Sequence, residues 1–65
     1  MKNHLRALRT ERGWTQEQLG QVLGVSRQAV YALETDKHDP SLDLAYRIAA
    51  AFGLPIEQIF LNPHL

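Results

Sequence analysis

Arg27, Gln28 and Tyr31 place three kinds of hydrogen-bonding side chain within five consecutive residues. A Gln amide can make two hydrogen bonds to adenine N6 and N7, and an Arg guanidinium can pair with guanine O6 and N7 or clamp a phosphate. A Tyr hydroxyl can reach a phosphate, or its ring can simply cover part of a helix. Such residues also occur on ordinary solvated helix faces, so their meaning depends on the element that positions them.

These residues fall in a stretch, about 16–35, that has the pattern of two short helices joined by a tight turn, QEQLGQVLGVSRQAVYALET. Thr15, just before it, and Gln18 have the spacing of a capping box, so the first helix begins directly after the threonine. Gly24 supplies the left-handed residue that ends this helix, and Ser26 is the N-cap of the next. The stretch therefore predicts a helix-turn-helix.

Each of the two helices has one apolar side and one polar side. The apolar residues at helical spacing are Leu19, Val22 and Leu23, then Ala29, Val30 and Leu33. A step of 100° per residue gathers on the opposite face of the second helix Gln28, Tyr31, Ala32 and Thr35. Since that polar face has no core to meet, we expect it to enter the major groove of DNA, with Gln28 as the main base-reading side chain.

Two further residues of this stretch call for a structural explanation. Gly20 lies inside the first helix, where glycine costs about 1 kcal/mol relative to alanine. We expect another part of the backbone to approach it, because helices joined by a short turn cross closely. Glu34 lies at the border of the apolar side of the second helix, so its carboxylate needs a partner.

Length and composition limit what the chain can be. Its 65 residues form one domain, 1–65, in which roughly 60% of the unfolded surface can be buried, so we expect no small-molecule effector domain. There is no cysteine, no apolar leader of ~7–15 residues and no apolar run of ~20, which predicts a cytoplasmic protein without a membrane partner. The formal net charge is zero, but residues 1–38 hold six of the seven Lys and Arg residues. The basic half contains the helix-turn-helix.

The rest of the chain supplies three more helices. Asn3 can cap the first, with Leu5 and Leu8 facing inward, and Trp14 after it is expected to fill part of the core. Ser41 can cap a long amphipathic helix that ends at Gly53. The C-terminal helix and tail, 55–65, carry more apolar surface than one small core needs. We therefore expect a homodimer interface made of Ile56, Ile59, Phe60, Leu61 and Leu65.

Catalytic and metal sites find little support in this sequence. The three histidines are His4, His38 and His64. None has a second ligand at the third or fourth residue after it, and the chain has no Gly-rich phosphate loop or nucleophile motif. We therefore expect no enzyme, no metal and no cofactor.

The whole pattern resembles the DNA-binding fold of the phage repressor and Cro (XRE) group of bacterial regulators. It is carried by TQEQLGQVLGVSRQAVYALE, then KHDPSLDLAYRIAAAFG and a short PIEQIF helix. The resemblance implies an all-α, compact five-helix repressor-like domain with helices two and three as the helix-turn-helix. It departs from the group at Thr35 and Asp36, where Asn-Gly or a more basic pair is common, and at Ala32, where a longer polar side chain is frequent.

The resemblance also implies roles for individual residues. Gln16 would bind a phosphate at the start of helix two, Lys37 would touch the DNA backbone, and Arg9 would form an ion pair with Glu34. The DNA-facing surface would include Arg27, Gln28 and Tyr31. In the same loop as Lys37, His38 is a candidate for phosphate contact, although polar loops are usually just solvated.

Two functions are consistent with these observations. The favoured one is a dimeric repressor that occupies a promoter by binding a near-palindromic operator in double-stranded DNA, with its two recognition helices about 34 Å apart. The alternative is a protein-interaction module, such as the DNA-binding antitoxin of a toxin-antitoxin pair, whose apolar C-terminal end binds a different protein.

Overall fold

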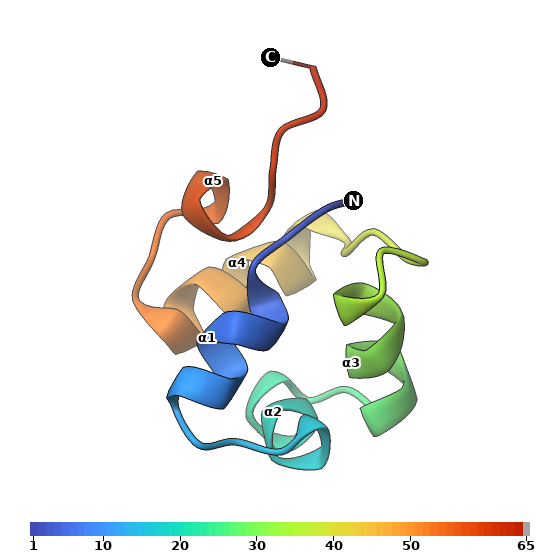
Figure 1. Cartoon of the computed structure of the whole chain (residues 1–65), viewed down its shortest axis with the longest axis vertical. Coiled ribbons are helices and arrows are strands. Elements are labelled where there is room, and N and C mark those ends of the chain that lie inside the picture. Colours follow the sequence, from blue (N-terminus) through green and yellow to red (C-terminus); the bar gives the residue numbers. More distant parts are fainter. Residues whose placement is uncertain (65) are drawn as a thin grey trace.

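The computed structural model describes residues 1–64 and arranges them in five helices without extended strands (Figure 1). In chain order these are α1 (Leu5–Glu11), α2 (Gln16–Leu23), α3 (Arg27–Glu34), α4 (Leu42–Phe52) and α5 (Ile56–Ile59). The predicted all-α class and the order of the helices are confirmed.

The start of α2 is fixed by a reciprocal capping box. Thr15 Oγ1 accepts a hydrogen bond from the backbone N–H of Gln18 at 3.0 Å, and Gln18 Oε1 accepts one from the backbone N–H of Thr15 at 2.8 Å. The helix ends at Gly24, whose φ of 75° lies in the left-handed region. After the turn, Ser26 Oγ accepts from the N–H of Ala29 at 3.1 Å and begins α3. Both caps follow the sequence prediction.

The turn between α2 and α3 is possible because Gly20 has no side chain. A Cβ at this position would lie 2.7 Å from the carbonyl oxygen of Val25, closer than real Cβ atoms come to such an atom. The backbone of the turn therefore rests directly on α2, as the glycine inside that helix predicted.

The core lies between the five helices. Its buried members are Leu5, Leu19, Leu23, Val30, Leu33, Ile48, Phe52, Ile59 and Phe60. Trp14 is half-buried against this cluster, with its ring centroid 5.6 Å from that of Phe52. Val22 departs from the expected apolar side of α2 and is 51% exposed. The buried arc of this short helix instead passes through Gly20, so the expectation for Val22 was wrong.

The N-terminal segment lies beside the C-terminal end of the described chain (Figure 1). The N–H of His4 donates to the carbonyl of Ile59, and the N–H of Leu61 donates to the carbonyl of Lys2, both at 2.8 Å. Asn3 does not occupy the N-cap position of α1, but its Oδ1 accepts from the N–H of Leu5 at 3.0 Å. Backbone hydrogen bonds thus join residues 2–4 to residues 59–61.

This pairing corrects part of the expected dimer interface. Ile59 and Phe60 are 0% and 4% exposed within the single chain, so their side chains have no surface to offer to a partner. Ile56 is half-buried and Leu61 is 46% exposed, and both remain available, whereas Leu65 lies outside the described residues.

Within residues 1–64, no helix combines the length and the apolar character needed to cross a membrane.

Candidate nucleic-acid interface

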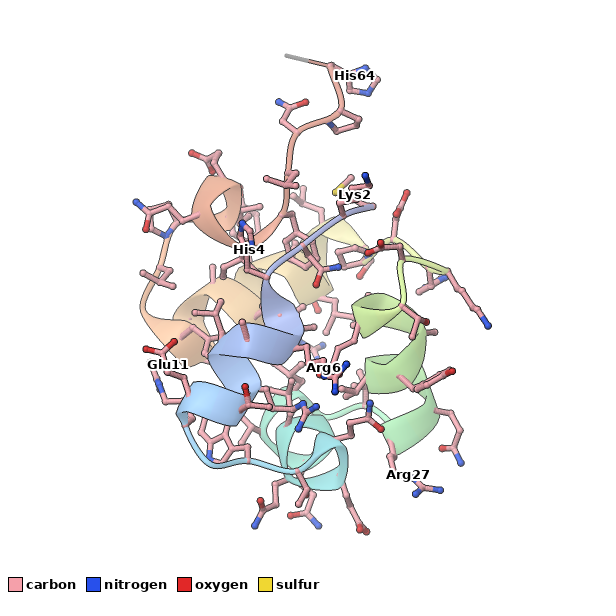
Figure 2. The ribbon with its side chains drawn as sticks, viewed as in Figure 1. Lys2, His4, Arg6, Glu11, Arg27 and His64 are labelled. Carbon is pink, nitrogen blue, oxygen red and sulfur yellow. The ribbon has the colours of Figure 1, made fainter. Side chains whose placement is uncertain are left out.

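One side of α3 faces solvent and the other faces the core. Its exposed residues include Arg27, Gln28 and Tyr31, while Val30 and Leu33 on the other side are fully buried. In Figure 2, Arg27 lies at the beginning of α3 and points into solvent. The helix is therefore anchored by one side and presents the other, as its periodicity predicted.

Two neighbouring hollows join this helix to α1 and α2. One is lined by Gln16, Arg27, Gln28 and Tyr31. The other is lined by Arg6, Arg9, Gln16, Tyr31, Glu34 and Thr35. Because Gln16 and Tyr31 belong to both, the structure brings these predicted residues together on one continuous face, which we call the α3 face.

A largely buried ion pair between Arg9 and Glu34 lies beside this face and connects α1 to α3. Arg9 Nε donates to Glu34 Oε2 at 2.6 Å and Arg9 Nη2 donates to Glu34 Oε1 at 3.2 Å, so the pair is bidentate. The two side chains are 11% and 3% exposed, respectively. Arg9 Nη1 also donates to the carbonyl oxygen of Trp14 at 2.8 Å. This arrangement links α1 to α3 and engages three of the five N–H donors of the Arg9 guanidinium.

Gln16 is attached to the same carboxylate. Its Nε2 donates to Glu34 Oε1 at 3.2 Å, which connects α2 to the pair. Thr35 also has a local partner, since its hydroxyl donates to the carbonyl of Tyr31 at 2.8 Å. The edges of the α3 face are thus held by side-chain hydrogen bonds, whereas its centre is solvated.

The loop after α3 places Lys37 beside Tyr31. The Lys37 ammonium lies 5.8 Å from the centroid of the Tyr31 ring, and its backbone N–H donates to the carbonyl of Ala32 at 3.0 Å. Asp36 makes this turn with a φ of 63°, in the left-handed region that glycine, asparagine and aspartate adopt more readily than other residues. His38 is exposed farther along the loop, and within residues 1–64 no hydrogen bond joins its side chain to the α3 face.

Two other arginines donate hydrogen bonds to carbonyl oxygens at the C-terminal ends of helices. Arg12 Nη2 donates to the carbonyl of Phe52 at 3.0 Å, at the C-terminus of α4. Arg47 Nη1 donates to the carbonyl of Leu23 at 3.1 Å, at the C-terminus of α2, and Arg47 Nη2 pairs with Asp43 at 2.7 Å. Such contacts suit cations, because the last carbonyls of a helix carry partial negative charge.

Arg6 is a residue of the α3 face that the sequence analysis missed. It is exposed, it lines the hollow shared with Tyr31 and Thr35, and Figure 2 shows it on the side of α1 that faces α3. Its spacing of three residues from Arg9 puts both arginines on one side of α1, and this signal could have identified it.

Comparison with known proteins agrees with this geometry. A family model described as helix-turn-helix matches residues 5–59, which include all five helices. The chain belongs to this XRE-type helix-turn-helix family of DNA-binding transcriptional regulators. The resemblance inferred from the sequence is therefore confirmed.

Several relatives are similar to this helix-turn-helix protein over most of its length. An uncharacterized HTH-type transcriptional regulator of Methanocaldococcus jannaschii is 52% identical over 61 residues, 94% of this chain and 92% of that protein. The uncharacterized HTH-type transcriptional regulator YgzD of Bacillus subtilis is 45% identical over 60 residues, 92% of this chain and 91% of that protein. An immunity repressor protein of Bacillus phage phi105 is 34% identical over 55 residues, 85% of this chain and 38% of that longer protein.

Two solved structures have the same fold. The hypothetical transcription factor NHTF from Neisseria superposes with a TM-score of 0.78 at 33% identity, covering 94% of this chain and 70% of that one. The restriction-modification controller protein C.AhdI from Aeromonas hydrophila also gives a TM-score of 0.78, at 32% identity, covering 88% of this chain and 86% of that one.

Proposed function

We propose that this helix-turn-helix protein is a dimeric repressor that binds a near-palindromic operator in double-stranded DNA and acts by occupying a promoter. The observation that carries the proposal is the α3 face. There, the exposed Gln28, Arg27 and Arg6 gather, while Arg9, Arg12 and Arg47 are engaged in contacts between helices.

Within this proposal, the residues of the α3 face have two kinds of role. Gln28 reads base edges, because its planar amide lies near the start of α3, where a helix in the major groove contacts bases. Arg27 and Tyr31 contact bases or the flanking phosphates. The DNA backbone is held by Gln16, Thr35, Lys37, His38 and, in addition, Arg6.

A dimer accounts for the apolar surface at the C-terminal end. In this proposal Ile56 and Leu61 form the centre of the dimer interface, because Ile59 and Phe60 are buried in the core of each subunit. A twofold axis there places two α3 helices about 34 Å apart, one turn of DNA, and so selects a site with two similar halves. Repression by occupancy is supported by the relation to a phage immunity repressor, although that protein is longer.

Selection of bound duplexes from a random library tests this function. We expect enrichment of one near-palindromic sequence whose half-sites are centred about 10 base pairs apart. Gln28→Ala should abolish or redirect the enrichment, and Glu11→Gln, which changes an exposed side chain at the end of α1, should leave it unchanged. Recovery of unrelated sequences by the unchanged protein would contradict the proposal.

A further inference from the structure

We propose that Glu34 is a positioning residue for DNA binding, because its carboxylate fixes the orientation of the Gln16 amide on the α3 face. This inference rests on the proposed function and adds to it a residue that does not itself touch DNA. It also predicts how the buried ion pair is connected to the surface.

The carboxylate of Glu34 needs several hydrogen-bond donors around it. Glu34 is 3% exposed, and a buried carboxylate is costly unless its oxygens accept several hydrogen bonds. Arg9 supplies two N–H donors, at 2.6 and 3.2 Å, and Gln16 Nε2 supplies a third at 3.2 Å. Gln16 is therefore held by a charged acceptor that is itself fixed in place by an arginine.

The two ends of the Gln16 amide differ in their hydrogen-bonding chemistry. One end is an NH₂ donor and the other is a carbonyl acceptor, and the ionised carboxylate of Glu34 can only accept. Turning the amide around would bring two acceptor oxygens against each other at the distance now occupied by a hydrogen bond. The nitrogen must therefore face Glu34, and the directions of the second N–H and of the carbonyl oxygen are defined.

Gln16 lies at the start of α2, next to the residues of the α3 face. It is the first residue of α2, where backbone N–H groups lack partners within the helix, and its side chain lines both hollows of the α3 face. Its second N–H is thus available to a phosphate oxygen beside residues that approach the groove. Holding the side chain before binding reduces the entropy that DNA binding must otherwise overcome.

A double-mutant cycle in DNA affinity tests the inference. The variants are Glu34→Gln, Gln16→Ala and the two combined, measured on the operator duplex enriched by the unchanged protein. Because Arg9 can only donate, a glutamine at position 34 turns its carbonyl oxygen toward Arg9 and its NH₂ group toward Gln16, so the Gln16 amide loses the acceptor that fixes its nitrogen. Immobilising one long side chain is worth roughly 0.5–1.5 kcal/mol, so Glu34→Gln should weaken binding about two- to tenfold.

The informative comparison is between the two backgrounds. If Glu34 acts through Gln16, Glu34→Gln has no further effect on affinity once Gln16 is alanine. The long-range effect of removing one negative charge is the same in both backgrounds and cancels in the cycle. Glu11→Gln, a change of an exposed acid at the end of α1, serves as the charge control.

Each outcome decides the matter. Equal weakening by Glu34→Gln in both backgrounds, or no weakening in either, overturns the positioning role. Thermal melts identify folded variants, and if Glu34→Gln does not fold, the pair Arg9→Met with Glu34→Leu removes the carboxylate while preserving apolar packing. Absence of duplex binding by the unchanged protein overturns the proposed function together with this inference, whereas equal losses in the two backgrounds overturn this inference alone.

Discussion

Arg6 and Arg12 are exposed arginines six residues apart, but they make different contacts and therefore have different expected roles. Arg12 donates to the carbonyl of Phe52 and stacks over the rings of Phe52 and Trp14, at 5.3 and 5.7 Å from the ring centroids. Arg6 instead lines the α3 face. Net charge therefore says little about this protein, because each cation is defined by what it touches.

This difference predicts opposite effects of two matched substitutions. Arg6→Ala should make the log–log salt dependence of DNA affinity shallower by about 0.9 per subunit, because one phosphate contact is lost, and should leave the melting temperature nearly unchanged. Arg12→Ala should lower the melting temperature and leave the salt slope unchanged. Titrations at several salt concentrations, together with thermal melts, check both; exchanged results would reverse the assignment.

The Arg9–Glu34 pair is expected to matter greatly for stability. Glu34→Ala leaves a cation of 11% exposure without its carboxylate, and the free energy of unfolding should fall by about 3 kcal/mol, a large share of what a small domain has. Arg9→Met combined with Glu34→Leu should be milder, because no unpaired charge remains. A thermal melt of Glu34→Ala within a degree or two of the parent would show that the pair contributes little.

At the scale of the helices, the backbone of the turn between α2 and α3 lies very close to α2 at Gly20. Gly20→Ala gains about 1 kcal/mol in helix propensity, but its methyl group would meet the Val25 carbonyl oxygen at 2.7 Å. Because backbone must move to relieve this contact, we expect a net loss of about 1–3 kcal/mol. Gln21→Ala, an exposed change on the same helix, is the control. Denaturant unfolding that shows Gly20→Ala as stable as the parent would contradict the close packing.

The elements could largely be predicted from sequence because their signals are local. Thr15, Ser26 and Gly24 act on backbone groups within four residues, and their caps and turn appear as expected. The burial of Ile59 and Phe60 could not be predicted in this way. It depends on pairing between the two ends of the chain, and counting apolar residues does not show which segment covers them.

The site was predictable to a similar extent. The helical period placed Gln28 and Tyr31 on the exposed side of α3, where the structure has them. The period alone did not reveal Arg6, because its place beside α3 depends on how α1 crosses that helix. The predicted burial of Val22 was wrong for a related reason. A helix of eight residues contacts its neighbours over a narrow arc, and the spacing of apolar residues does not say where that arc is centred.

For the molecule as a whole, the proposed dimer is what would convert one α3 face into an operator-binding protein. Burying a half-exposed leucine from each subunit contributes roughly 2 kcal/mol in all, so Leu61→Ser should weaken the dimer by more than tenfold. Val22→Ser is a matched control, since Val22 on α2 is 51% exposed and Leu61 is 46% exposed. Sedimentation equilibrium at micromolar concentration measures both; a monomeric parent that binds single half-sites would contradict the dimer.

We propose that α3 reads bases while the loop after it holds the DNA backbone. Gln28 is the second residue of α3, and Lys37 lies in the loop beyond the end of that helix. Gln28→Ala should cost about 1–3 kcal/mol on the preferred site and relax the choice of base at one position per half-site. Lys37→Ala should weaken all sequences alike.

The most direct test is the affinity of these two variants for matched and single-mismatch duplexes at several salt concentrations. Gln28→Ala should lose discrimination at one position with an unchanged salt slope. Lys37→Ala should keep its discrimination while its slope becomes shallower by about one unit per subunit. If Gln28→Ala instead lowers the affinity equally for every duplex, or Lys37→Ala alters the preferred base, the division between reading and holding is contradicted.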